Sequence, residues 1–327
     1  MKGLLARWED ACAGSLALRF VDVCLRGVGQ VMFQDNPLTG LLFLLAIAWG
    51  AVAAGAPSIL FGGLLGLIAA TLTGYWVKAE PSVIRAGLCG YNGVLVGLAL
   101  PTFLAPGFPL WVYVLIGGCV STLVNLGAAK TLKPLGAPAL TFPFVLVTWL
   151  LLLASYGFAR LPATALPTGG VVAPFESAPS LAMGLGTFLT GAFLSISQVF
   201  LKASAISALL LLLGLAASSL AAAALALGGA ILAVIVAHLF GAESDVISQG
   251  LLGFSPVLTA IALGVTFNRP TPRILAYAAL GVVFTVIAQA ALNVALRPFA
   301  IPALTAPFVL VSWMFLLPPH LFGEKQE

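Results

Sequence analysis

Two copies of a short motif supply the polar groups with the clearest chemical potential in this apolar chain. Residues 138–144 read Pro-Ala-Leu-Thr-Phe-Pro-Phe, and residues 302–308 read Pro-Ala-Leu-Thr-Ala-Pro-Phe. Proline inside an apolar segment frees backbone carbonyls, which hydrocarbon tolerates only where they face protein or water. Each motif therefore offers carbonyl oxygens beside one hydroxyl, from Thr141 and Thr305. A single copy could merely kink a helix, but two equivalent copies predict broken helices that meet and present these groups to a solute.

Two glutamines form a second matched pair. Gln30 and Gln198 each lie in an apolar stretch and each is followed by valine, Val31 and Val199. A glutamine amide both donates and accepts hydrogen bonds, which suits a solute that does the same. Hydrogen bonding between helices is the alternative role of such residues in membranes.

Large apolar side chains recur near these polar groups. Phe33, Tyr91 and Phe254, together with Leu95 and Leu258, could form a narrow slot around a flat solute. Aromatic residues in apolar helices usually serve packing alone. The matched places of Tyr91 and Phe254 favour the slot.

The elements that position these residues must lie in a membrane. The chain is 61% hydrophobic and 7% charged, with a mean hydropathy of +1.14, whereas a soluble domain has about a quarter of its residues charged. We predict an all-α integral membrane protein with ten spans of the required length. Their ranges are 38–56, 58–77, 86–104, 110–130, 139–158, 204–222, 224–240, 249–267, 274–294 and 303–321. The stretches 15–34 and 181–200 are expected to span or to re-enter as pore segments.

An internal repeat organises the spans. Residues 79–91 resemble residues 242–254 at an offset of 163, Thr141 resembles Thr305 at an offset of 164, and Gln30 resembles Gln198 at an offset of 168. Because five spans are an odd number, the second copy must be inverted in the membrane. We predict two inverted repeats of five spans at 1–158 and 181–327, joined by a connector at 159–180. Inverted repeats place a substrate site at the bilayer midplane, where the copies meet.

The distribution of basic residues predicts the orientation. With a cytoplasmic N-terminus, the cytoplasmic side holds most of the lysines and arginines, as the positive-inside rule expects. These are Lys2, Arg7, Arg19, Arg26, Lys78, Arg85, Lys130, Lys133, Arg269, Arg273 and Lys325. The outer side keeps Arg160, Lys202 and Arg297. We expect a multi-pass protein of a bacterial inner membrane with both termini cytoplasmic.

Several function classes find no support in the sequence. We find no ionisable side chain in the middle of any predicted span except His238, which has no repeat mate and which we expect near the outer end of its helix. Ion-coupled pumps use intramembrane carboxylates or histidines, so transport should be passive and the solute uncharged. The sequence shows no nucleophile–base pair, phosphate-binding loop or metal-ligand spacing, and its basic residues are scattered. We therefore expect no enzyme activity, no cofactor, no metal and no nucleic-acid partner.

The same motifs resemble the urea transporter family over nearly the whole chain. Residues 137–144 and 301–308 are similar to the family's repeated Leu-Pro-x-x-Thr-x-Pro-Phe signature, with the leading leucine replaced in both. Residues 25–33, followed by Asn36-Pro37, resemble its first pore segment, and residues 87–93 resemble its Gly-Leu-x-Gly-aromatic-Asn motif. The chain departs from the family at Ser255-Pro256, where asparagine is usual, and at Lys202-Ala203-Ser204, which replaces an Asp-Asn-Pro turn.

The resemblance implies one urea pore per subunit of a homotrimer. It implies that Gln30 and Gln198 bind urea amides at the two mouths, and that Thr141 and Thr305 flank the central constriction beside backbone carbonyls. The implied apolar walls are Phe33, Leu95, Val199 and Phe254, with Val31, Tyr91, Leu201 and Leu258 as their symmetry mates. We expect passive, selective transport of urea or a close neutral amide. The alternatives are an ion-coupled secondary transporter and an ammonia or water channel for another small solute.

Overall fold

The computed structural model describes residues 2–172 and 184–318, and these fold almost wholly into helices. Within these ranges the β-structure amounts to one isolated bridge between Leu104 and Ala163. Three predicted features fall partly outside them: the connector beyond residue 172, the start of the second repeat, and the end of the last span with the C-terminus.

The helices of the first half follow a simple order. They are α1 (Lys2–Gly14), α2 (Leu16–Gln30), α3 (Pro37–Ala53), α4 (Pro57–Trp76), the short α5 (Pro81–Arg85), α6 (Tyr91–Phe103), α7 (Phe108–Leu132), the 3-10 turn η1 (Lys133–Leu135) and α8 (Phe142–Ser155). Polar side chains fix several starts. Asn36 accepts from the amide of Leu38 and precedes Pro37, which is the usual chemistry of a helix N-terminus.

The second half repeats this order from α2 onward. Its elements are α9 (Leu185–Ser197), the 3-10 turn η2 (Gln198–Phe200), α10 (Ala205–Ser218), α11 (Leu220–Leu239), the short α12 (Ser244–Ser248), α13 (Phe254–Ile261), which continues as a π-helical turn η3 (Ala262–Thr266), α14 (Pro272–Leu296), the 3-10 turn η4 (Arg297–Phe299) and α15 (Ala306–Leu316). Helix α1 has no counterpart among the described residues of this half.

Left-handed residues also recur in pairs. Five of the six left-handed residues in the first half have a left-handed mate at the repeat offset, and Gly55 is the exception. The pairs are Phe33 with Leu201, Lys78 with Gly241, Gly87 with Gly250, Gly136 with Ala300, and Leu140 with Leu304. At Gly87 a Cβ atom would lie 2.2 Å from the amide nitrogen of Gly27, and at Gly250 it would lie 2.3 Å from that of Ser195. Glycine is therefore required at both places by the close approach of a neighbouring helix.

The helices differ in whether they are long and apolar enough to cross a bilayer. Four described helical segments are long and apolar enough to cross a bilayer, at Pro57–Trp76, Phe108–Leu135, Leu220–Leu239 and Pro272–Phe299. Helices α9 and α10 form a fifth candidate that is bent by 73°. Five further apolar helices have 10–17 residues. Hydropathy predicted ten full spans because it detects apolar residues, whereas residues 86–90, 136–141, 249–253 and 300–305 are apolar but lie outside helices.

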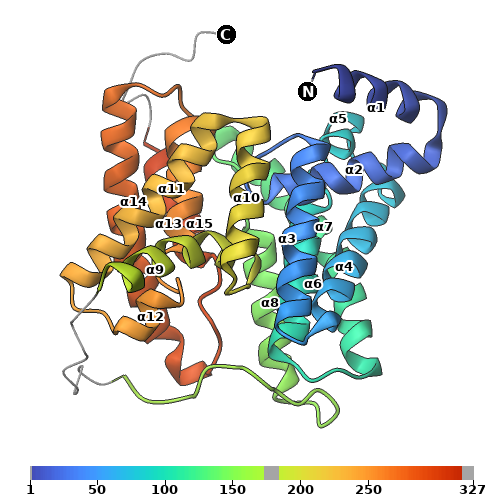
Figure 1. Ribbon diagram of the computed structural model, residues 1–327. Helices are drawn as coiled ribbons and strands as arrows, with labels where there is room; N and C mark the ends of the chain where they lie inside the picture. The colour runs from blue at the N-terminus through green and yellow to red at the C-terminus, as the bar shows by residue number, and fades with distance from the viewer. Residues whose placement is uncertain (1, 173–183, 319–327) are drawn as a thin grey trace.

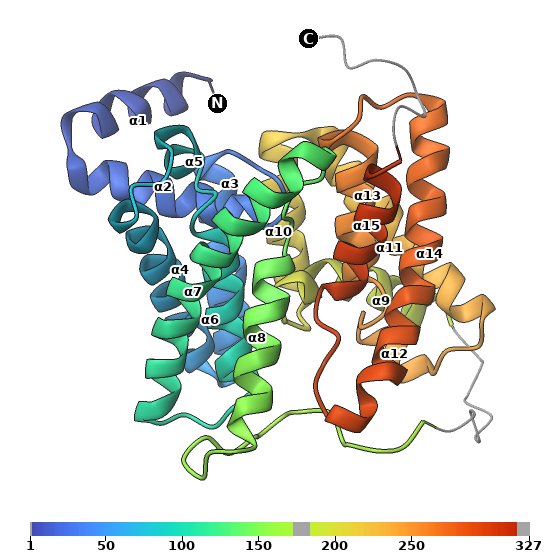
Figure 2. The same cartoon turned by 180° about the vertical axis from the view of Figure 1, so that it is seen from behind.

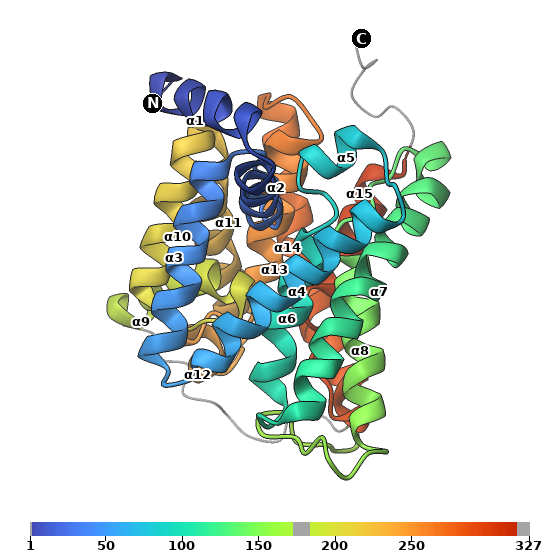
Figure 3. The ribbon, with the colours of Figure 1, turned by 90° about the vertical axis from the view of Figure 1, so that its right-hand side faces the viewer.

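The two halves lie side by side and run in opposite directions (Figure 1). Helix α3 runs downward beside α10, which runs upward, and the pair forms one seam between the halves (Figure 3). On the opposite side α8 and α15 form a second seam, where α8 descends and α15 rises (Figure 2). Hydrogen bonds across the first seam are reciprocal. Thr39 Oγ1 donates to the carbonyl of Gly214 at 2.7 Å, and Ser207 Oγ donates to that of Ala46 at 2.8 Å.

Candidate functional site

The two threonines of the repeated motif meet at the second seam. Thr141 Oγ1 and Thr305 Oγ1 lie 2.6 Å apart and share a hydrogen bond, and both residues are buried. Each threonine is the N-cap of its helix, α8 or α15, yet neither side chain bonds its own helix. The hydroxyls point across the seam because Leu140 and Leu304, both left-handed with φ of 51°, turn the chain immediately before them. Two residues 164 positions apart thus form one polar contact in an apolar interior.

Two tryptophans that the sequence analysis did not single out hold this contact from both sides. Trp149 Nε1 donates to the carbonyl of Pro302 at 2.9 Å, and Trp313 Nε1 donates to the carbonyl of Pro138 at 2.8 Å. Each tryptophan therefore binds the broken segment of the other half. The repeat offset of 164 relates both donors and both acceptors, so a search for paired residues beyond the prolines would have found them.

The glutamines hold equivalent loops. Gln30 Nε2 donates to the carbonyl of Ala86 at 2.9 Å, and Gln198 Nε2 donates to the carbonyl of Gln249 at 3.0 Å. Both acceptors directly precede a left-handed glycine, Gly87 or Gly250. Within the described parts of the chain no bond to either Oε1 atom is found. Each half-buried amide thus uses its Nε2 as a donor, and its Oε1 is unoccupied among the described residues.

Tyr91 anchors the motif in the first half. Its hydroxyl donates to the carbonyl of Leu140, next to Thr141, and also contacts Asn125 Oδ1. Asn92 extends this network, because its Oδ1 accepts from the amide of Phe144 at 3.1 Å. The predicted wall residue Tyr91 is thus also a support for the carbonyl that precedes Thr141.

The second half has different side chains at the positions that match Tyr91, Asn92 and Asn125. Phe254 replaces Tyr91 and has no hydroxyl to donate, so the carbonyl of Leu304 lacks that anchor. Ser255, which departs from the family pattern, donates to Gln289 Oε1 at 2.8 Å. Gln289 occupies the position that matches Asn125, so a serine–glutamine pair stands in for the asparagine pair of the first half.

The remaining predicted wall residues divide into two groups. Val31, Leu95, Val199 and Leu258 are at most 2% exposed, whereas Phe33, Leu201 and Phe254 are half-buried. Phe33 is left-handed, with a φ of 63°, and makes edge contacts with the rings of Phe267 and Phe308 across the halves. Its mate Leu201 is left-handed too, with a φ of 59°. Sequence reasoning missed Phe267, which follows the π-helical turn and matches Phe103 at the offset of 164.

Ionisable groups stay away from this seam. His238 lies in the last turn of α11, as expected for a residue near a helix end. Lys202 is buried in the break between η2 and α10, and its stem lies over Gly50 of α3. The groups around Thr141 and Thr305 are therefore hydroxyls, carbonyls, indoles and apolar side chains, which can contact a neutral solute without binding or moving a charge.

Comparison with known proteins supplies the family. The sequence model of the urea transporter family matches residues 21–320. The chain belongs to the urea transporter family. It is 28% identical to urea transporter 1 of Ovis aries over 313 residues, which cover 92% of this chain and 77% of that protein. It is also 28% identical to urea transporter 1 of Rattus norvegicus, over 92% of this chain and 78% of that protein.

The range of the family match separates two parts of the molecule. Residues 21–320 include the threonine, tryptophan and glutamine pairs, so these groups lie within the range that the family model matches. Helix α1 lies before the match. The family membership confirms the resemblance that the repeated threonine motif indicated.

Proposed function

We propose that this protein conducts urea passively across a membrane, along a path between its two halves that crosses the Thr141–Thr305 contact. The observation that supports this most is the contact itself, with its reciprocal tryptophan bonds. It brings two hydroxyls and the two proline-containing segments together at the second seam, where both halves present equivalent groups. Membership of a transporter family, and the names of the urea transporters that resemble this chain, supply the substrate. The activity is transport and not catalysis.

The chemistry of the path suits urea. Urea is flat and neutral, with N–H donors along its edges and one carbonyl acceptor. A polar group transferred to hydrocarbon without partners costs about 2–7 kcal/mol, so the path must replace most hydrogen bonds that urea makes in water. Gln30 and Gln198 would accept from urea N–H groups at the two ends. At the centre urea would exchange the threonine–threonine bond for bonds to the two hydroxyls.

Apolar walls give the second part of the mechanism. Selective conduction requires binding that is favourable enough for entry and weak enough for release. Phe33, Tyr91, Leu95 and Val199 would border a flat passage, with Val31, Leu201, Phe254 and Leu258 at the related places. A path with no charged group binds no ion, so urea would move down its own gradient.

The architecture that we propose consists of two inverted repeats at 1–158 and 181–327 with a connector at 159–180. The opposite directions of the halves, the paired left-handed residues and the reciprocal bonds at both seams support it. Segments 15–34 and 181–200 would re-enter the membrane at opposite faces. We further propose a homotrimer in a bacterial inner membrane, with both termini cytoplasmic. The family membership does not favour an ion-coupled transporter or an ammonia or water channel.

The decisive experiment measures entry of labelled urea into proteoliposomes. We expect rapid equilibration that saturates at high urea, that a flat analogue such as thiourea inhibits, and that neither a proton nor a sodium gradient changes. Accumulation of urea above its external concentration in an ion gradient would support coupled transport and contradict the proposal. Urea entry no faster than into protein-free vesicles would contradict the proposal that this protein conducts urea.

A further inference from the structure

A cavity of about 1000 Å³ opens beside α1, away from the threonine contact. Its walls come from α1, α2, the C-terminal end of α4, and α5. The charged residues among its lining are Glu9, Arg19, Asp22, Arg26, Asp35, Lys78 and Arg85. This is the face that the basic residues predict to be cytoplasmic.

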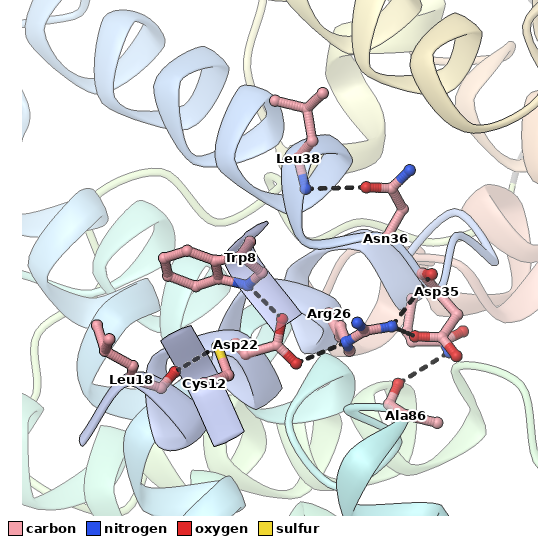
Figure 4. A network of polar contacts seen from close by, with 10 residues as sticks. Trp8, Cys12, Leu18, Asp22, Arg26, Asp35, Asn36, Leu38 and Ala86 are labelled. Carbon is pink, nitrogen blue, oxygen red and sulfur yellow. Dashed lines mark hydrogen bonds and ion pairs between the residues drawn. The ribbon is translucent and has the colours of Figure 1, made fainter. Parts of the chain in front are cut away.

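Both aspartates that line the cavity form salt bridges with the same arginine. Asp22 Oδ2 lies 2.7 Å from Arg26 Nε, and Asp35 Oδ1 lies 2.7 Å from Arg26 Nη1 (Figure 4). The other oxygen of Asp22 accepts from Trp8 Nε1 at 2.7 Å, which fastens α1 to α2 (Figure 4). Both carboxylates are already paired with Arg26. Neither of them therefore neutralises the other cations that line the cavity, which are Arg19, Lys78 and Arg85.

Three cations of the cavity lack a carboxylate partner within the described ranges. Lys78 and Arg85 are exposed, and neither forms a salt bridge there. Arg19 donates from Nε and Nη2 to the backbone carbonyls of Cys12 and Ala13, which leaves its charge unneutralised. Glu9, on exposed α1, is the one carboxylate of the lining outside the Arg26 cluster. Glu80, the N-cap residue of α5, accepts from Ser82 Oγ at 2.6 Å, so residues 78–85 carry two cations and one carboxylate, a net charge of about +1.

Lys78 follows the C-cap of α4 and ends that helix in the left-handed conformation that is common there. Lys78 is left-handed with a φ of 53°, a conformation that costs a residue with a Cβ about 1–2 kcal/mol. Its mate in the second half is Gly241, left-handed with a φ of 72°, and the mate of Arg85 is Ser248. One half thus uses glycine and serine where the other keeps two cations, one of them strained.

Exposed apolar side chains lie close in sequence to residues that line the cavity. Trp76 and Leu16 are each 79% exposed, and Tyr75, which lines the cavity, is 44% exposed. Tryptophan and tyrosine with neighbouring lysine or arginine are typical of the membrane–water boundary. Lys78, a cation that would attract phosphate, therefore follows Trp76, a side chain that suits acyl chains, by two residues.

We propose that this cavity binds the headgroup of an anionic phospholipid, with its phosphate at Lys78 and Arg85 and its acyl chains along Trp76 and Leu16. Ala86 lines the same cavity, and its carbonyl holds the amide of Gln30 (Figure 4). The bound lipid stabilises the loop on which that glutamine depends. Helix α1, which precedes the family match, forms the far wall of the site.

The test replaces both cations with the residues of the other half, as K78G/R85S. Purified, delipidated full-length protein is titrated with short-chain phosphatidylglycerol, with short-chain phosphatidylcholine or with inorganic phosphate, and bound molecules are counted by native mass spectrometry. Each basic residue near anionic lipid contributes about 1 kcal/mol, so we expect phosphatidylglycerol affinity to fall about 30-fold in K78G/R85S. The matched control, K130S/K133S, removes two cations from the same face outside the cavity and should change affinity less than twofold.

Three results would overturn the proposal: equal affinity of K78G/R85S and the unchanged protein, equal binding of phosphatidylcholine and phosphatidylglycerol, or equal binding of inorganic phosphate, which would indicate a free-anion site. Glycine suits the left-handed position, so the lipid-free variant should melt no lower than the unchanged protein. If it does melt lower, K78Q/R85Q repeats the charge test with longer side chains. None of these outcomes depends on urea transport.

Discussion

Thr141 and Thr305 lie in matching surroundings, whereas the faces near Gln30 and Gln198 differ in charge. At the centre, both hydroxyls are buried, both tryptophans bind the opposite motif, and both preceding leucines are left-handed. Near Gln30 the chain places Arg26, Lys78 and Arg85, and the matching positions hold Leu194, Gly241 and Ser248. In the function that we propose, the solute meets both halves at the centre, while each end faces its own compartment and leaflet. Duplication is retained where the chemistry is shared and lost where the surroundings differ.

The largest effect should come from removing both central hydroxyls. In T141V/T305V the shape is kept, but urea loses two hydrogen bonds at the narrowest place. At about 1.4 kcal/mol for each bond, we expect urea flux in proteoliposomes to fall about 100-fold. The single variants should fall by equal factors. A large difference between T141V and T305V would break the equivalence of the two halves at the centre.

The two tryptophan hydrogen bonds also test whether the two halves are equivalent at the centre, this time through the stability of the protein. Replacing Trp149 or Trp313 by phenylalanine leaves the carbonyl of Pro302 or Pro138 buried without its donor, at a cost of about 1–3 kcal/mol. We expect W149F and W313F to lower the free energy of unfolding, measured by denaturant titration in detergent, by similar amounts. Trp8→Phe is the control at the periphery, and it should affect the attachment of α1 while leaving urea flux unchanged.

Substitutions at Tyr91 and at its mate Phe254 compare the two halves next to the central threonines. Y91F removes the hydroxyl that holds the carbonyl of Leu140 and makes the first half resemble the second. We expect a loss of about 1 kcal/mol in unfolding free energy and a modest reduction in flux. F254Y adds a hydroxyl and should not rescue Y91F, because Ser255 and Gln289 have already replaced the asparagine pair there. Full rescue would show that the two networks are interchangeable.

The smallest effect is expected about two turns beyond Thr141 and Thr305, along α8 and α15. Thr148 Oγ1 and Ser312 Oγ are buried, and neither hydroxyl has a hydrogen-bond partner within the described chain. Replacing such a group with an apolar one of similar shape is neutral or stabilising, by up to about 1 kcal/mol. We expect T148V and S312A to leave urea flux unchanged and to raise the unfolding free energy slightly. A fall in flux would extend the polar path to these two hydroxyls.

Sequence reasoning identified the family and the meeting of Thr141 with Thr305, because proline and threonine at a fixed offset leave a visible pattern. It could not find where the short helices begin. Residues 86–90 and 300–305 are as apolar as the helices after them, and their departure from helical geometry depends on the left-handed Gly87 and Leu304. It also overlooked Trp149 and Trp313, since an indole in an apolar helix resembles ordinary packing until its acceptor is known.

The crossed tryptophan bonds have a consequence for biogenesis. The ribosome delivers Pro138 and Trp149 to the membrane long before Trp313 and Pro302 exist, so a carbonyl and an indole N–H must wait in the bilayer without their final partners. Unsatisfied groups of this kind cost several kcal/mol each in hydrocarbon. The first half is therefore left incomplete until α15, the last described helix, enters beside it. A chain stopped before residue 302 would keep most of its helices, yet it would present an open polar seam to lipid and to quality-control proteases.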